Sequence, residues 1–198
     1  MKQYLRILSF VAFFTASSAN AGLLLEPYLG YIVSGGGDAK FSSGGSTWDL
    51  DYSGLQLGGR LGFSKLGLMA GLDYSFGSHE VESTSGATTF KDDVDRDQLG
   101  FFVGYQFPMM LRVWGTYFFN AASEGTQTGD HLFENTDEFS GSGMALGVGY
   151  TGLPFLSINL EYRTFDYDEW KSNGVDQANF QKYETTEILL SVSAPFDF

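Results

Sequence analysis

Few residues of this chain have the type and spacing that catalysis needs. His79 and His131 are the only histidines, and serines such as Ser78, Ser83 and Ser123 are plentiful around them. A serine nucleophile requires a histidine base that is itself held by a carboxylate, and no spacing here connects the three. We therefore predict that no residue is catalytic and that the chain is not an enzyme.

One acidic motif has the spacing of metal ligands. Asp93, Asp95 and Asp97 stand at every second position, as the first ligands of a calcium-binding loop do. The match then fails, because Gln98 replaces the glycine of that loop and Gly104 replaces its bidentate glutamate. The chain has no cysteine either, so a thiolate site is impossible. We predict no metal site and no cofactor, and interpret the aspartates as a solvated acidic face.

The charge of the chain restricts its partners. It has 24 Asp and Glu against 11 Lys and Arg, which gives a formal net charge of −13. Nucleic acid is excluded as a partner, since phosphate binding needs clustered Lys and Arg. An acidic surface also repels anionic lipopolysaccharide, so we expect weak association with that lipid only where divalent cations bridge the two.

The first 21 residues predict export. They combine a basic start at Lys2 and Arg6, an apolar stretch over 5–14 that is too short to span a bilayer, and a small-residue exit at Ala19-Asn20-Ala21. We interpret 1–21 as a cleaved signal peptide and 22–198 as one domain. The alternative, a short N-terminal anchor helix, is disfavoured because small neutral residues follow the apolar stretch.

The chain ends in a strand with two unlike faces. From Ile188 onward every second residue is apolar, and the last residue is Phe198. The same period of two recurs along the chain and predicts eight strands, each close to the length that a tilted membrane strand requires. We place these strands at 24–34, 52–63, 66–77, 97–107, 111–121, 140–150, 155–166 and 184–196.

The predicted connections alternate in length. Three are short turns, at Ser64-Lys65, Pro108-Met109-Met110 and Thr151-Gly152-Leu153-Pro154, whereas 35–51, 78–96, 122–139 and 167–183 are long, polar and rich in acid. Outward aromatic residues would then form two belts, as expected at two membrane interfaces. One belt is Tyr31, Tyr74, Tyr117 and Tyr162, and the other is Phe63, Tyr105, Phe107, Tyr150, Phe196 and Phe198.

In these features the chain resembles the small eight-stranded outer-membrane β-barrels of Gram-negative bacteria, the group of the OmpA transmembrane domain and OmpX. The resemblance covers the whole mature chain and implies an all-β fold, an antiparallel up-and-down transmembrane barrel with eight strands. It also implies location in the outer membrane, both mature termini in the periplasm, and recognition of the Phe198 strand by the barrel assembly machinery.

An eight-stranded barrel is filled by its own side chains, so charges that point inward need partners. Folding the first hairpin about residue 43 places Glu26 beside Arg60. Folding the last hairpin about residue 175 places Arg163 beside Glu187, with Glu161 also near. We predict internal ion pairs that hold the barrel together as a polar plug, with a gate for ions or a ligand as the alternative.

The function that these features favour is structural or interactive, with the barrel as an anchor and the four acidic loops as a contact surface. Aromatic residues of the loops are candidate anchor points for an unidentified external partner: Trp48, Phe90, Phe133, Trp170 and Phe180. Two alternatives stay open. One is a narrow channel or transporter for a small or hydrophobic solute, and the other is a soluble, lipocalin-like periplasmic barrel whose apolar face points inward.

Overall fold

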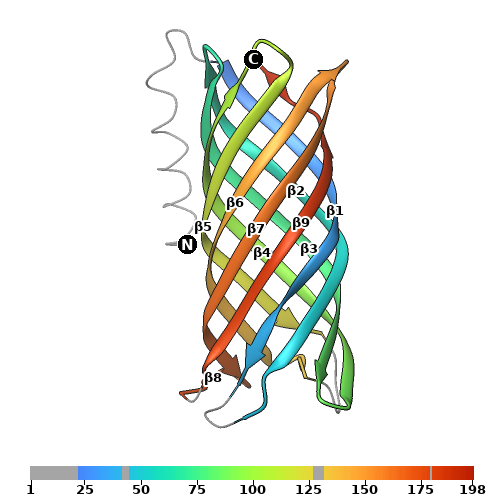
Figure 1. Cartoon of the computed structure of the whole chain (residues 1–198). Helices are drawn as coiled ribbons and strands as arrows, with labels where there is room; N and C mark the ends of the chain where they lie inside the picture. The colour runs from blue at the N-terminus through green and yellow to red at the C-terminus, as the bar shows by residue number, and fades with distance from the viewer. Residues whose placement is uncertain (1–21, 42–44, 127–131, 179) are drawn as a thin grey trace.

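One antiparallel sheet closes on itself to form the barrel (Figure 1). In this computed structural model the described residues are 22–198 except 42–44, 127–131 and 179, so the predicted signal peptide lies outside them. The long strands are β1 (Gly22–Lys40), β2 (Trp48–Lys65), β3 (Leu68–Ser85), β4 (Thr88–Gln106), β5 (Leu111–Gly125), β6 (Asp137–Leu153), β7 (Leu156–Ser172) and β9 (Lys182–Ser193). Each pairs with the next, and β9 pairs with both β7 and β1. The predicted eight-stranded antiparallel barrel is confirmed.

One end of the barrel carries three tight turns together with Gly22 and the C-terminus; we call it the short-turn end (Figure 1). The first turn is Leu66-Gly67, whose φ angles of 52° and 85° are those of a type I′ hairpin. The predicted turn at Ser64-Lys65 is therefore two residues too early, because the glycine that accepts a positive φ comes later. The third turn is likewise centred later than predicted, at Pro154-Phe155.

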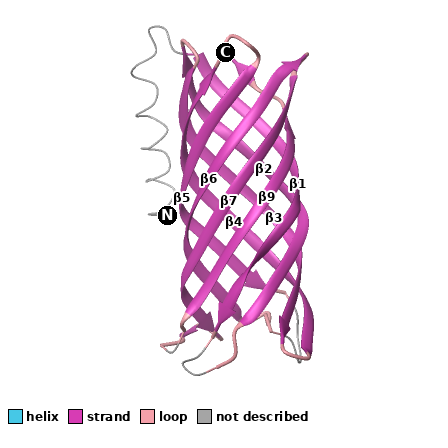
Figure 2. Cartoon of the chain, in the orientation of Figure 1, coloured by secondary structure: helices cyan, strands magenta, loops and turns pink. Residues whose placement is uncertain are grey.

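At the opposite end, which we call the far end, the four connections are shorter than the predicted loops, because the strands continue into them. β3 and β4 run on until Ser85 pairs with Thr88, and only Gly86 and Ala87 connect them. β7 continues to Ser172 and turns at Asn173-Gly174 into the short strand β8 (Val175–Asp176). Figure 2 shows strand reaching almost to the far end of the barrel. Most residues assigned to loops therefore belong to the wall.

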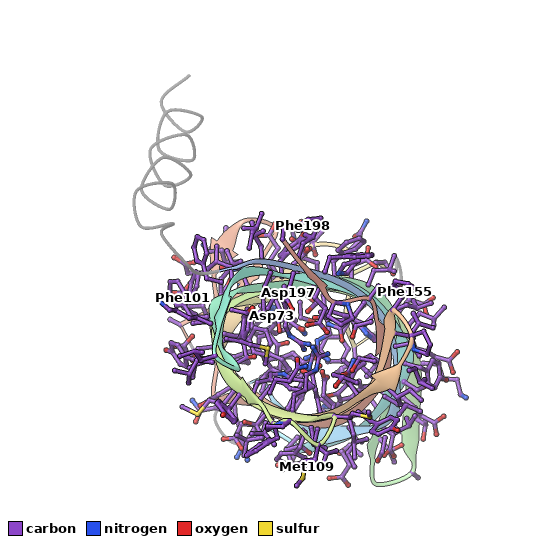
Figure 3. All side chains as sticks on the ribbon, turned by 90° about the horizontal axis from the view of Figure 1, so that it is seen from above. Asp73, Phe101, Met109, Phe155, Asp197 and Phe198 are labelled. Atoms are coloured by element: carbon purple, nitrogen blue, oxygen red, sulfur yellow. The ribbon has the colours of Figure 1, made fainter. Side chains whose placement is uncertain are left out.

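The polarity of the two wall surfaces reverses along the barrel. In the half next to the short-turn end, the outward residues form an apolar band that includes Leu57, Phe101 and Tyr162, and the inward residues combine polar side chains and glycines with a few large rings such as Trp114. Figure 3 shows this contrast, with Asp73 inside the ring and Phe101 outside it. In the far half, which we call the extension (34–54, 77–96, 120–143 and 164–187), Val81 and Val94 point inward and are buried. Most charged residues there face outward, whereas Arg96 and Glu187 are buried.

Both predicted aromatic belts contribute to the outward apolar band. The tyrosines at 31, 74, 117 and 162 are about half exposed, as are Phe107, Tyr150 and Phe196. The C-terminal strand is interrupted, because Pro195 has no N–H to donate to the ladder. After this break the short strand β10 (Phe196–Asp197) pairs with β1, and Phe198 exchanges backbone hydrogen bonds of 2.9 and 3.0 Å with Leu23. Among the described residues, no helix is long and apolar enough to span a membrane.

Candidate functional site: charge ladder, aromatic plug and acidic collar

Four arginines and four carboxylates on the inward face of the wall form one network of ion pairs, which we call the charge ladder. Its members are Arg60, Arg96, Arg112 and Arg163, with Glu26, Asp73, Glu161 and Glu187. All eight side chains are buried, with at most 2% of each exposed. Because these charges balance, the ladder is neutral as a whole, and each guanidinium reaches at least one carboxylate.

The ladder begins near the short-turn end with Arg112. Its guanidinium donates two hydrogen bonds to Glu26, one of them 2.7 Å from Nη1 to Oε2, in the bidentate arrangement that fits a carboxylate best. Arg112 Nη2 also donates to Asn159 at 2.8 Å and to Ser193 at 3.1 Å. This arginine therefore connects β5 with β1, β7 and β9 across the interior.

Arg60 occupies the next level and has three carboxylates around it. Its Nε donates to Asp73 at 2.9 Å, and its Nη2 donates to Glu161 at 2.6 Å. The contact with Glu26, which the sequence predicts, is confirmed at 3.5 Å. The guanidinium also lies between the rings of Tyr28 and Trp114, at 5.0 and 4.4 Å from their centroids, so that two cation–π contacts add to the ion pairs.

Arg163 continues the ladder toward the far end. Its pair with Glu161, at 3.0 Å, and its longer contact with Glu187, at 3.8 Å, are both as predicted. Its Nη1 donates to the amide oxygens of Gln56 and Gln98 at 3.1 and 3.2 Å. Neutral amides thus accept the hydrogen bonds of Nη1, from which the second carboxylate is more distant.

The last level contains Arg96 and a histidine. Arg96 Nη1 donates to Glu187 at 2.7 Å, and Nε donates to the Tyr167 hydroxyl at 3.2 Å. His79, predicted in an external loop, instead lies inside the extension on β3 and is 1% exposed. Neither of its ring nitrogens has a hydrogen-bond partner, so within the described residues it forms no catalytic arrangement. Burial, and then the Arg96 charge, lower the pKa of His79 to about 4, and therefore the ring is neutral at pH 7.

Large side chains fill the space around the ladder opposite inward glycines. A Cβ at Gly147 would collide with the Trp114 ring, and one at Gly58 would collide with the ring of Tyr28. Inward glycines therefore provide the space that these two large rings occupy. The ladder and the rings together fill the interior. Side chains of opposite walls touch there directly, as Arg60 does with Glu161 and Arg112 with Glu26.

The far end of the interior is closed by aromatic rings, which we call the aromatic plug. Its members are Phe41, Phe133, Phe139, Trp170, Phe180 and Tyr183, whose ring centroids lie 5.1 to 6.5 Å from those of their neighbours in the plug. Three of the five aromatic anchor points predicted for a partner, Phe133, Trp170 and Phe180, belong to this plug. Trp170 also donates from Nε1 to Asp137 at 3.0 Å. The remaining two, Trp48 and Phe90, pack on each other at 5.5 Å.

The outward face of the extension, with Asp97 at its border, carries carboxylates on every long strand, which we call the acidic collar. Its members are Asp38, Asp49, Asp51, Glu80, Glu82, Asp93, Asp95, Asp97, Glu124, Glu138, Asp166, Asp168, Glu169 and Glu184. Register places several like charges side by side: Glu80 opposite Asp93, and Glu124 between Asp95 and Glu138. Such neighbours repel each other, so the collar attracts cations. In the part of the chain that the structure describes, no three acidic or histidine side chains converge as metal ligands.

A closed barrel with an apolar belt outside and a polar interior defines a transmembrane β-barrel. The chain matches the model of the outer membrane protein beta-barrel domain over residues 7–196, and it belongs to this family. It is therefore a protein of the Gram-negative outer membrane. No curated protein sequence matches it.

Solved structures of other outer-membrane barrels share the fold at low sequence identity. The attachment invasion locus protein Ail of Yersinia pestis is 13% identical, with a TM-score of 0.53 over 88% of this chain and 99% of its own. The outer membrane protein OprG of Pseudomonas aeruginosa is also 13% identical, with a TM-score of 0.50 over 89% of this chain and 96% of its own. These likenesses show the fold alone.

Proposed function

We propose that this protein is a sealed membrane anchor that displays the acidic collar on the cell surface, where the collar contacts cationic or cation-bridged partners. The observation that carries this proposal is the distribution of charge. The interior ladder is neutral, while the carboxylates of the collar face outward in the extension. In this orientation the short-turn end and both mature termini are periplasmic, because short periplasmic turns and longer external segments are the common asymmetry of such barrels.

The partner chemistry of the proposal follows from the collar. Lipopolysaccharide is anionic, so contact with it requires divalent cations between its phosphates and the carboxylates, held diffusely and without a dedicated site. The structure of Ail was determined with a heparin analogue, sucrose octasulfate. A polyanion of that kind is a poor match for this collar. The Phe198 strand, which closes against β1, is the part that we assign to recognition by the barrel assembly machinery.

Transport is the alternative function, and the ion pairs and rings that fill the interior argue against it. Arg112, Arg60, Arg163 and Arg96 bridge opposite walls at successive levels, and the aromatic plug lies beyond them. A conducting path would have to break several buried ion pairs, each of which is costly to leave unpaired. The lipocalin-like alternative fails for the membrane half, since its outward residues are apolar.

Planar-bilayer recording and surface labelling test the proposal. The purified full chain should show only background conductance, and a cysteine introduced at Ser140, an exposed position of the extension, should react with an impermeant thiol reagent on intact cells. A cysteine at Leu66, in the first short turn, is the matched control and should react only after the outer membrane is opened. Steady channel activity, or labelling in the reverse pattern, would contradict the proposal.

A further inference from the structure

The outer wall contains a groove at the border between the apolar band and the acidic collar. It runs across β1 to β4 and has a volume of about 860 Å³. Its lower part is lined by apolar and aromatic side chains, among them Tyr31, Leu57 and Phe76. Because these residues belong to the outward apolar band, this part of the groove faces the acyl chains of the membrane.

The floor of the groove is bare backbone. The pairing of β2 with β3 breaks off after Gly54 and His79 and resumes at Leu57 and Phe76. Gly54 borders this interruption and Gly77 lies in it, and a Cβ at Gly54 would come within 2.7 Å of the Ser78 carbonyl oxygen. The two strands approach so closely here that neither glycine can be replaced freely. Beneath the groove the wall is thus a close contact of two backbones, and outward side chains form the sides of the groove.

The upper rim of the groove is acidic. Glu80, Asp95 and Asp97 line it, and Asp97 accepts a hydrogen bond of 2.6 Å from the Tyr74 hydroxyl of the aromatic belt. This bond holds the acidic rim next to the aromatic belt, at the level of the membrane where lipid headgroups lie. Among the residues that line the groove, the only cationic side chain is Arg96, which is buried in the charge ladder.

We propose that this groove binds one lipid of the outer leaflet, with an acyl chain along its apolar part and a cationic amine of the headgroup against the rim carboxylates. Charge complementarity argues for an amine. Among the described residues no three acidic or histidine side chains converge as ligands of one metal ion, whereas an ammonium group needs only one or two carboxylates. This inference rests on one part of the proposed function, the orientation that places the extension on the outer side of the membrane.

The test measures which lipids stay bound to the folded full-length barrel. The protein is incubated with equal amounts of two lipids that have the same oleoyl chains, anionic phosphatidylglycerol and cationic lysyl-phosphatidylglycerol, and bound lipid is counted by native mass spectrometry. We expect the cationic lipid to be retained about five-fold over the anionic one, the upper range for an exposed charge pair. In the variant Asp95→Asn/Asp97→Asn the ratio should fall close to one.

Two further variants separate the groove from the general charge of the barrel. Asp166→Asn/Asp168→Asn removes two collar carboxylates with the same spacing, on β7 and away from the groove, and should leave the ratio unchanged. Ser78→Trp adds bulk at an exposed position in the groove and should reduce retention of both lipids.

Four results would overturn the inference. These are equal retention of the two lipids by the wild type, an equal effect of the β7 control, a preference for the anionic lipid once Mg²⁺ is added, and a second copy of the chain in place of lipid. None of them would affect the conductance or labelling results, so a failure here is distinguishable from a failure of the proposed function.

Discussion

Removing the Arg60 guanidinium should destabilise the barrel far more than removing an exposed charge. In Arg60→Met, Glu26 keeps Arg112 and Glu161 keeps Arg163 at 3.0 Å. Asp73 keeps only the hydrogen bond of 2.9 Å from Tyr28. One buried carboxylate is then uncompensated, and breaking such a pair costs about 3–5 kcal/mol of unfolding free energy.

A second substitution tests whether the loss comes from charge or from packing. In Arg60→Met/Asp73→Asn the ladder has equal numbers of cations and anions again, so most of the lost stability should return. Lys91→Met is the exposed control. It breaks the ion pair of 2.9 Å between Lys91 and Glu82, whose side chains are 65% and 45% exposed. This control should cost at most about 1 kcal/mol.

The assay is equilibrium unfolding in urea of the barrel in phospholipid vesicles, with the folded fraction read from its gel migration before boiling. This readout avoids tryptophan fluorescence, which would respond directly to Arg60 because Trp114 stacks on it. The reasoning would be refuted if Arg60→Met cost less than about 1 kcal/mol, or if the double variant were no more stable than the single one.

Three other perturbations follow from the interior. The pKa of His79 is about 4 in the folded barrel and 6.5 for the free side chain, so the unfolded chain binds the proton first. The free energy of unfolding should therefore fall by about 3 kcal/mol as pH drops from 6.5 to 4. His79→Phe should flatten this part of the plot of urea midpoint against pH, and an unchanged slope would contradict the assignment. Gly147→Ala should lower stability by about 1–3 kcal/mol because its Cβ meets Trp114, whereas Gly59→Ala, with 3.7 Å of space, should be tolerated in the same gel assay. Phe139→Ala should cost about 3–5 kcal/mol through the cavity it leaves in the aromatic plug, yet bilayer conductance should stay at background because the ladder still blocks the interior.

The membrane half of the fold was accessible from sequence because its pattern is uniform. A period of two with apolar residues outward identifies each strand there, and the sum of paired residue numbers is constant within a hairpin. Glu26 and Arg60 were paired on this basis, as were Arg163 and Glu187, and both pairs form. The register of single hairpins does not predict which side chains meet across the barrel. The Arg60 to Glu161 bond joins residues 101 positions apart, and it depends on closure of the whole sheet.

The extension was missed because its polarity is opposite to that of the membrane half. At His79, Val81 and Ser83 the alternation continues, but the apolar member now points inward and the charged member points outward. A search for apolar-out strands ends where this reversal begins. The turn residues were the available signal, since Asn173-Gly174 is a strong two-residue hairpin signal and lies inside a predicted loop.

The reversal has a physical cause and a consequence for function. Beyond the bilayer the wall is in water on its outer side, so the extension buries apolar side chains inside, as a soluble barrel does. Because the charge ladder is neutral, the net negative charge of the chain lies outside it, and the collar displays most of that charge. A transporter would need its polar groups unpaired and facing a path through the interior. Here the charges of the ladder satisfy one another, and most of the unbalanced charge is on the outward face of the extension.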